Sequence, residues 1–394
     1  MKLLILVRLA MLEYIARAKF QIPTPQGQKI VSKGEVLRLS SLKATAGVQR
    51  GVLLEKSVSG LQDILHTVAA TTAVLVDKLQ YSYDQASKKA LRLAMSLLIR
   101  HEALKTFRPP TPEFQDEVTE FNRTATGKNP ITKINSDKGA GEWAGYNCNI
   151  GEGCSHGCLY CYASEIAVTR FKRVASKEAW RDEKLIDVKT GKCKKYPEPI
   201  MFATSHDITG TYLQAYRCHL YNILKAGNTV ILVSKPHRES IEAICSEFSS
   251  FRDTMILRFT IGGLDDDALK VWEPGAPSLS ERMWCLQYAF EQGFKTSVSA
   301  EPMLVNAEGA EQLYYAVEPF ITEDIWFGKM FKIGSYVKHR NPEVAQQATE
   351  LQEFYKDDNI MQFVRRMTGL PKVAWKDSIK EVIQKNTKRN EVTE

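Results

Sequence analysis

The chain has 394 residues, of which 44% are hydrophobic and 25% are charged, and its formal net charge is +7. This composition is typical of a globular protein, long enough for two or three domains or for one large barrel with additions. The apolar opening at residues 1–12 is interrupted by Arg8 and followed by no small-residue cleavage site, and no run approaches the ~20 apolar residues of a membrane span. We therefore expect neither a secretory signal nor a membrane segment.

The positive charge is concentrated in the first 108 residues, which hold 17 Lys/Arg against 7 Asp/Glu, whereas the remainder carries a net charge of −3. Residues 1–20 and 58–106 have the apolar periodicity of amphipathic helices. This basic, mainly helical N-terminal region, residues 1–112, is suited to the phosphate backbone of nucleic acids, although a solvated basic helix surface would give the same pattern. Three prolines at 109–112 mark its end, and the polar residues 113–142 are expected to run as an extended linker.

Short apolar runs alternate with helical patterns over residues 143–335. Strands are predicted at residues 146–150, 200–204, 229–234, 255–260, 295–300 and 324–328, and helices at 162–180, 209–226, 237–249, 279–293 and 307–319. This alternation favours an α/β fold with a parallel sheet and crossover helices. We expect a partial (βα)6 version of the TIM-like barrel, with its chemistry at the carboxyl ends of the strands, and a C-terminal helical extension over residues 336–394.

Three of the eight cysteines, Cys154, Cys158 and Cys161, fall within eight residues. Such a cluster is unlike a disulfide framework and indicates a metal-binding site in a reducing compartment, for which we expect the cytoplasm. The cysteines lie in a glycine-rich loop after the first predicted strand. Glycines let the backbone fold tightly around a compact inorganic group.

The spacing C-x3-C-x2-C supplies three thiolates, the usual ligands of iron–sulfur clusters. In a [4Fe–4S] cluster, three protein ligands leave the fourth iron for an exogenous ligand, and S-adenosylmethionine (SAM) can bind there through its amino nitrogen and carboxylate oxygen. An electron from the reduced cluster can then cleave SAM to a 5′-deoxyadenosyl radical, which abstracts hydrogen from an unreactive C–H bond. Structural zinc, with Cys148 or His156 as a fourth ligand, is the alternative, but the spacing matches no common zinc module.

The cysteine loop resembles the signature of the radical SAM superfamily, C-x3-C-x-Φ-C, with Tyr160 as the aromatic residue Φ. Further stretches are similar to the DNA-repair-photolyase-like branch of that superfamily, which contains spore photoproduct lyase: GEWA at 141–144, LVSKP at 232–236, WEPGAPSLSER at 272–282 and SVSAEPML at 297–304. The resemblance covers about residues 140–335. It implies a radical SAM partial barrel, cluster ligation by the three cysteines, and a position for Tyr160 near the adenine of SAM.

The same resemblance implies three further SAM-binding residues. Lys235 follows the third predicted strand, where the branch has a lysine that pairs with the SAM carboxylate, although a surface lysine is the alternative. Ser205 and Asp207 follow the second predicted strand, where the superfamily contacts the SAM amino group, and at least one of them is expected to take part.

Arg258 and Glu301 are candidate catalytic residues. A charge within a predicted strand is costly unless it is paired, so Arg258 is expected to face the barrel interior and meet SAM or Glu301, unless its strand edge faces water. Glu301 ends the fifth predicted strand, a placement typical of functional residues in barrels, although helix capping or ion pairing would also explain it.

The sequence departs from spore photoproduct lyase just beyond the second predicted strand. That enzyme relies on a hydrogen-donating cysteine there, whereas residues 203–207 of this chain contain none, so we do not expect thymine-dimer repair. We expect a radical SAM enzyme acting on an unidentified substrate, with nucleic acid favoured, and a reductant such as flavodoxin or ferredoxin. The alternatives are a nucleic-acid-binding module with a structural metal, and a radical SAM enzyme for a peptide or small metabolite.

Overall fold

The computed structural model describes residues 21–24, 27–30, 83–188, 193–337 and 341–393, and the chain forms two compact units, residues 1–102 and 103–394. In the first unit, strands β1 (Gln21–Thr24) and β2 (Gly27–Ile30) pair antiparallel. Helix α4 (Tyr83–Leu104) confirms the helical periodicity predicted for residues 84–104. The helix expected at residues 1–20, and the part of the second helical segment before residue 83, lie outside the described residues.

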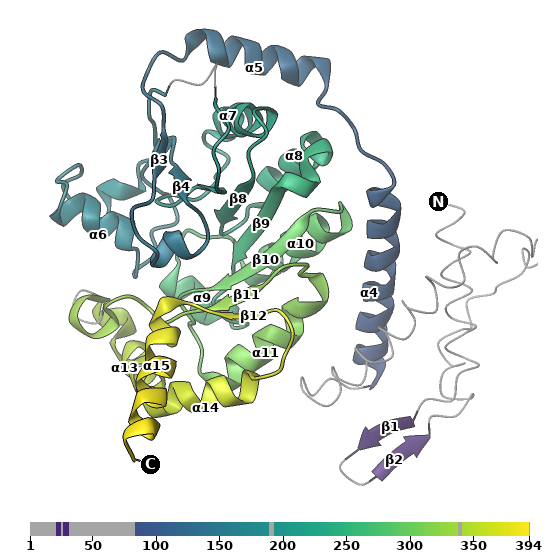
Figure 1. Cartoon of the computed structure of the whole chain (residues 1–394), viewed down its shortest axis with the longest axis vertical. Helices are drawn as coiled ribbons and strands as arrows, with labels where there is room; N and C mark the ends of the chain where they lie inside the picture. Colours follow the sequence, from purple (N-terminus) through teal and green to yellow (C-terminus); the bar gives the residue numbers. More distant parts are fainter. Residues whose placement is uncertain (1–20, 25–26, 31–82, 189–192, 338–340, 394) are drawn as a thin grey trace, which may run out of the picture. The chain divides into compact units, whose positions relative to one another are not determined.

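An eight-stranded sheet organises the second unit, in the order β12-β11-β10-β9-β8-β7-β4-β3 (Figure 1). The strands are β3 (Ile131–Lys133), β4 (Tyr146–Cys148), β7 (Ile200–Phe202), β8 (Val230–Ser234), β9 (Met255–Thr260), β10 (Lys295–Ala300), β11 (Ile325–Phe327) and β12 (Val373–Trp375). All neighbouring pairs from β4 to β12 are parallel, and only β3 joins antiparallel. The six predicted strands are confirmed and lie side by side in chain order, as a partial (βα)6 barrel requires.

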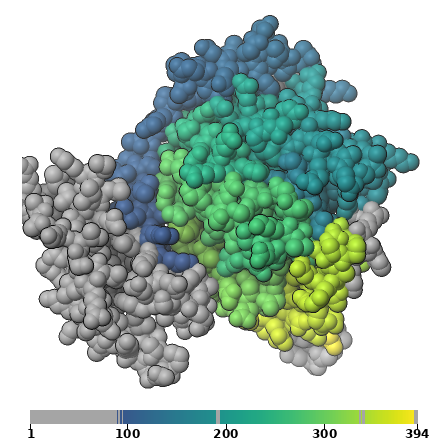
Figure 2. Space-filling view, turned by 180° about the vertical axis from the view of Figure 1, so that it is seen from behind, coloured from purple at the N-terminus to yellow at the C-terminus, as the bar shows by residue number. Residues whose placement is uncertain are grey.

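Helices follow the strands as the alternating pattern predicted. They are α6 (Tyr162–Thr169), α7 (Leu213–Lys225), α8 (Arg238–Glu247), α9 (Asp266–Trp272), α10 (Leu279–Glu291) and α11 (Ala307–Val317). The helix predicted at 162–180 is wrong beyond Thr169, because Lys172 adopts the left-handed conformation, with φ of 50°, that ends a helix. Residues from the middle of the chain, coloured teal to green, form most of the face seen in Figure 2.

Residues 113–142 do not run as the extended linker that we expected. Helix α5 (Pro112–Thr124) begins with Thr111 as its N-cap, whose side chain accepts from the Phe114 N–H group, and proline occupies its first turn. Phe114 is buried and packs edge-on against Tyr221 and Phe248, with ring centroids 5.7 and 5.8 Å away. This helix was not predicted from the sequence because the segment is polar and only two of its helical residues are buried.

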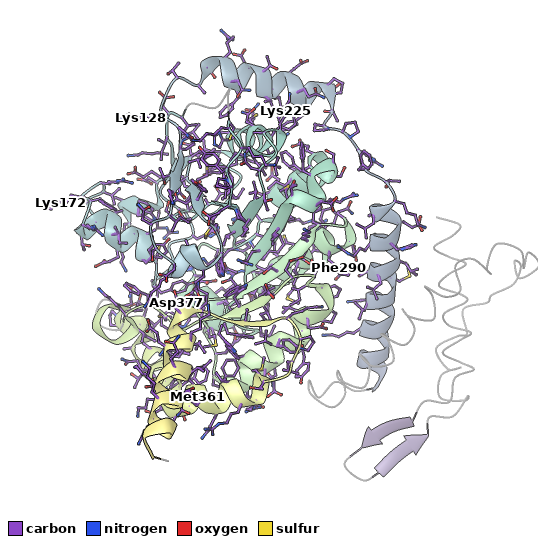
Figure 3. The ribbon with its side chains drawn as sticks, viewed as in Figure 1. Lys128, Lys172, Lys225, Phe290, Met361 and Asp377 are labelled. Atoms are coloured by element: carbon purple, nitrogen blue, oxygen red, sulfur yellow. The ribbon has the colours of Figure 1, made fainter. Side chains whose placement is uncertain are left out.

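The C-terminal region contains the expected helices, α13 (Ala345–Phe354), α14 (Asp357–Met367) and α15 (Asp377–Thr393). Strand β12, which precedes α15, was not expected. It has three residues, all half-buried, and pairs with β11 at the sheet edge. Asp377, labelled in Figure 3, accepts a hydrogen bond from the Gly139 N–H group at 2.8 Å and so joins α15 to the segment before β4.

The two faces of the sheet differ in what covers them. Successive side chains of a strand point to opposite faces. On one face Phe202, Leu232 and Leu257 belong to the main hydrophobic core. On the other, Met201 and Ile231 form a small cluster with Trp143. No helix of the described residues has the length and apolar character needed to cross a bilayer.

His219 on α7 is a buried histidine without a polar partner. Its side chain is 2% exposed, its ring stacks on Phe202, and neither ring nitrogen has a hydrogen-bond partner among the described residues. Burial lowers the pKa of His219 to about 4. Burial therefore favours the neutral form of the His219 imidazole in the folded protein.

We expect the free energy of unfolding to fall as pH decreases from about 6.5 to about 4, because the unfolded chain protonates this histidine first. His219→Phe should remove up to about 3 kcal/mol of this pH dependence. Urea unfolding at pH 7 and pH 4.5 measures it, with the exposed His101→Gln as control. Equal pH dependence in wild type and His219→Phe would contradict the assignment.

Candidate functional site

A cavity of about 780 Å³ lies at the carboxyl ends of the parallel strands. Most of the predicted site residues line it, although they come from four separate segments of the chain. These residues are Cys154, Cys158, Tyr160, Cys161, Ser205, Asp207, Lys235 and Glu301. Arg258 does not line this cavity.

The cysteine loop follows β5 (Gly151–Glu152) and ends where α6 begins. Gly153 has φ of 92°, and a side chain there would come within 2.5 Å of the Asp182 carbonyl oxygen. Glu183 holds the loop from the other side, because its carboxylate accepts hydrogen bonds from the Ser155 N–H group at 3.0 Å and from the Thr209 hydroxyl at 2.5 Å. Glu183 belongs to no motif, so it could not be singled out from the sequence.

Two of the three thiols, those of Cys154 and Cys158, lie in an environment that disfavours bare thiolates. Cys154 and Cys158 are buried, and burial raises the pKa of the Cys158 thiol to about 12. Cys161 is the N-cap of α6, and its Sγ accepts from the Ser164 N–H group at 3.4 Å. Buried thiolates that share one cavity need a cationic centre, as a metal or cluster provides. The donor set therefore fits an iron–sulfur cluster held through three sulfurs, and no fourth cysteine is among the described residues that line the cavity.

Neither residue considered as a fourth zinc ligand is well placed for that role. Cys148 is fully buried in β4 and is not among the described residues that line the cavity. His156 has both ring nitrogens engaged, Nδ1 at 2.9 Å from Asp207 Oδ2 and Nε2 at 2.8 Å from His237 Nε2. When Nδ1 of His156 donates to the Asp207 carboxylate, Nε2 of His156 accepts a hydrogen bond from Nε2 of His237. This arrangement fixes the tautomers of His156 and His237. Cys154, His156 and Asp207 have ligand atoms within 4.8 Å of one another, but these hydrogen bonds account for the grouping.

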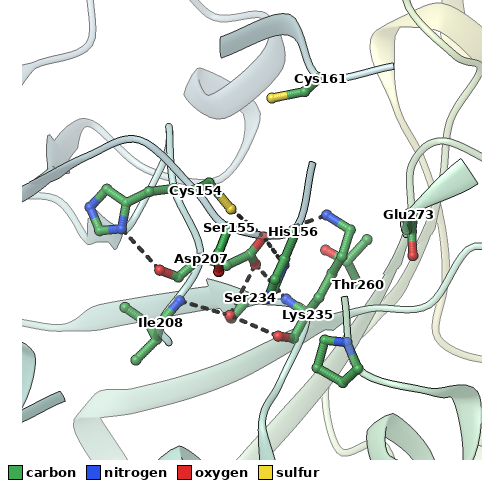
Figure 4. Close-up of polar contacts among 12 residues, drawn as sticks. Cys154, Ser155, His156, Cys161, Asp207, Ile208, Ser234, Lys235, Thr260 and Glu273 are labelled. Carbon is green, nitrogen blue, oxygen red and sulfur yellow. Dashed lines mark hydrogen bonds and ion pairs between the residues drawn. The ribbon is translucent and has the colours of Figure 1, made fainter. Parts of the chain in front are cut away.

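Asp207 is the centre of a polar network that joins the cysteine loop to two strands (Figure 4). Its Oδ1 accepts from the Ser234 hydroxyl at 3.0 Å and from the Lys235 N–H group at 2.6 Å, while Oδ2 faces His156. Burial alone would raise the pKa of Asp207, but the charge of Lys235 and the hydrogen bond with His156 outweigh burial and hold that pKa well below its ordinary range. Asp207 is therefore a largely buried, ionised carboxylate with most of its acceptor capacity used.

Lys235 presents its ammonium group to the cavity between Asp207 and an aromatic ring. Its Nζ lies 3.6 Å from Asp207 Oδ2 and 5.7 Å from the ring centroid of Tyr160. Burial would lower the pKa of Lys235, but Asp207 and Cys158 outweigh burial and raise it. Ser205 is half-buried nearby, and its N–H group donates to Asn149 Oδ1 at 3.1 Å.

Tyr160 is fixed by two residues that sequence reasoning did not single out. Its hydroxyl donates to Glu273, and Glu273 pairs with Arg282, both side chains being almost fully buried. Arg282 also donates to the Pro277 and Thr260 carbonyl oxygens at 2.9 and 3.3 Å. The available signal was the stretch WEPGAPSLSER, which contains both residues.

Arg258 faces the interior, as expected, and its contacts within the chain are with a serine and two tryptophans. Its Nε donates to Ser297 Oγ at 2.9 Å, and its guanidinium lies over the rings of Trp143 and Trp326, 4.4 and 5.5 Å from their centroids. No ion pair links Arg258 to Glu301 among the described residues, so the expected contact is corrected. The aromatic faces stabilise the buried cation in place of a carboxylate.

Glu301 lines the far end of the cavity and pairs with a lysine from the C-terminal region. Lys376, which follows β12, lies with its Nζ 3.3 Å from Glu301 Oε2 and 2.6 Å from Glu142 Oε2. Lys380 also contacts Glu142, at 2.7 Å. Nothing in the sequence pattern predicted this cluster.

Comparison with known proteins found no matching protein-family model and no matching curated protein. Among solved structures, the chain is similar to spore photoproduct lyase variants, one of them with a dinucleoside spore photoproduct. That match has 13% identity and a TM-score of 0.41, over 66% of this chain and 84% of the other. A second variant has 13% identity and a TM-score of 0.42, over 68% of this chain and 85% of the other. Streptococcus suis SuiB bound to S-adenosylmethionine has 10% identity and a TM-score of 0.35, over 82% of this chain and 63% of the other.

Arg282→Met should destabilise the protein by about 3–5 kcal/mol, because it leaves the Glu273 carboxylate buried without its cation. Chemical unfolding measures the loss. The control is Arg123→Met, which breaks the exposed pair with Glu120 and should leave the midpoint unchanged. Equal stability of the two variants would show that the Glu273–Arg282 pair is not needed for folding.

Proposed function

We propose that the chain is a radical SAM enzyme. When bound, a [4Fe–4S] cluster and SAM supply a 5′-deoxyadenosyl radical that abstracts hydrogen from the substrate. The observation that carries the proposal is the meeting of three cysteine thiols with the Asp207–Lys235 pair in one cavity, at the carboxyl ends of a parallel sheet. This is where barrel enzymes of this architecture place their chemistry.

Different residues of the chain are proposed to bind the cluster and SAM. Cys154, Cys158 and Cys161 hold the cluster through their sulfurs. Lys235 is proposed to bind the carboxylate of SAM, since a buried ammonium forms strong charge-assisted hydrogen bonds with such a group. Asp207 already accepts hydrogen bonds from three partners, so we propose that Ser205 contacts the SAM amino group and that Asp207 organises the site.

Tyr160 is proposed to form the wall next to the adenine of SAM. Its hydroxyl is held by Glu273, so the ring has a fixed orientation between Lys235 and the core. Glu301, which lines the cavity, and Arg258, which is not among its lining residues, stay candidates for action on the substrate.

Nucleic acid is the proposed substrate class, supported by the excess of positive charge in residues 1–108. Binding whose affinity falls steeply with salt would support it. Release of 5′-deoxyadenosine only with a peptide or a small metabolite would favour those substrates.

Cys158→Ala should abolish both the bound iron and the formation of 5′-deoxyadenosine, because one cluster ligand is removed. The measurements are iron content, the visible absorption of anaerobically reconstituted protein, and chromatography of SAM reactions reduced with dithionite. Cys245→Ala, which removes a buried thiol of α8 outside the cavity lining, should retain both. Zinc as the sole bound metal in the wild type would contradict the proposal.

Lys235→Met should weaken SAM binding by about 10- to 100-fold, since the variant loses a charge-assisted hydrogen bond to the carboxylate. Equilibrium binding of SAM to the reconstituted protein measures this change. Lys225→Met is a matched control, because Lys225 also lies over a tyrosine ring, 5.4 Å from Tyr221, but on the outer surface of α7. An unchanged dissociation constant for Lys235→Met would remove Lys235 from the SAM site.

A further inference from the structure

The proposed cofactor-binding residues occupy only one end of the cavity. The cysteine loop, Asp207 and Lys235 follow β4, β7 and β8, whereas Glu301 follows β10. Neighbouring strands are about 4.8 Å apart, so the chain segment carrying Glu301 lies about 10 Å along the sheet from that carrying Lys235. The Glu301 end therefore offers space for a second molecule beside the cofactor.

The walls at this end come partly from the region after the six βα units. Met330 and Phe331 line the same cavity. Phe331 is 60% exposed despite its apolar ring. Exposed aromatic side chains that line a cavity are typical of a surface that a ligand covers.

The two carboxylates at this end have different numbers of lysine partners. Glu142 is buried and contacts both Lys376 and Lys380, whereas Glu301 contacts only Lys376, and at a longer distance. The Glu301 side chain is 32% exposed, while that of Lys376 is 2% exposed. A carboxylate offers about four acceptor positions, and the described residues use only one oxygen of Glu301. Its remaining acceptor positions are available to a molecule in the cavity.

We propose that Glu301 is the substrate-recognition residue of this cavity, and that it binds an N–H donor group of the substrate, a cationic group most tightly. The inference rests on the proposed function and deepens it, since it states the chemistry of the substrate group that enters beside SAM. The Glu301 carboxylate disfavours phosphate and carboxylate groups of the substrate beside it. Lys376 contacts Oε2 of Glu301, which leaves Oε1 as the acceptor for the substrate group.

Three ligands with the same ring test the proposal: benzamidine is a cationic donor, benzamide a neutral donor and benzoate an anionic acceptor. Their binding to anaerobically reconstituted protein with SAM is measured by titration calorimetry. In the wild type we expect benzamidine to bind at least tenfold more tightly than benzoate, with benzamide between them. Glu301→Gln should bring benzamidine and benzamide to within about threefold of each other.

The matched control is Glu343→Gln, which neutralises an exposed carboxylate that lines the same cavity and should keep the full benzamidine preference. The amide oxygen of Glu301→Gln can still accept from Lys376, so the fold should persist, as the melting temperature checks. Glu301→Asp provides a second variant that keeps the charge and should keep the preference for benzamidine over benzoate.

Benzamidine binding no tighter than benzoate in the wild type, or a preference that survives in Glu301→Gln, would overturn the assignment. Either result can occur while the wild type still releases 5′-deoxyadenosine from SAM, so failure of the recognition site is distinguishable from failure of the proposed function.

Discussion

A single, largely buried carboxylate, that of Asp207, joins the parts of the chain on which the cavity depends. It binds His156 of the cysteine loop, and Ser234 and Lys235 at the end of β8, while itself following β7. A buried charge is stable only when its partners stay in place, because removing one leaves a costly unpaired group. The cysteine loop is therefore held in register with two adjacent strands by electrostatics as well as by the backbone.

The fold was predictable where local pattern and tertiary environment agree. Each strand of the parallel sheet is a short apolar run, and amphipathic helices separate the runs, so periodicity located β4 and β7–β11. Helix α5 was missed because only Phe114 and Val118 are buried on it, too few to give a clear apolar stripe. Strand β12 was missed because three half-buried residues at a sheet edge carry little pattern of their own.

The candidate site was predictable to the extent that its residues lie in motifs or at strand ends. The cysteines, Tyr160, Asp207 and Lys235 meet in the cavity because parallel strands direct their carboxyl ends to the same side. Glu183 and Lys376 could not be found in this way, because their partners are distant along the chain and only tertiary contact unites them. The contact expected between Arg258 and Glu301 was misjudged for a related reason: the guanidinium lies over the faces of two tryptophans instead.

Strand β12 and Lys376 have a consequence for the order in which the protein matures. During synthesis they leave the ribosome after all six βα units, so the nascent barrel carries Glu142 and Glu301 before the lysine that contacts both. Until β12 docks on β11, the two carboxylates lack this shared cation and repel each other. The wall of the cavity at Glu301 is therefore completed only after translation has passed residue 376.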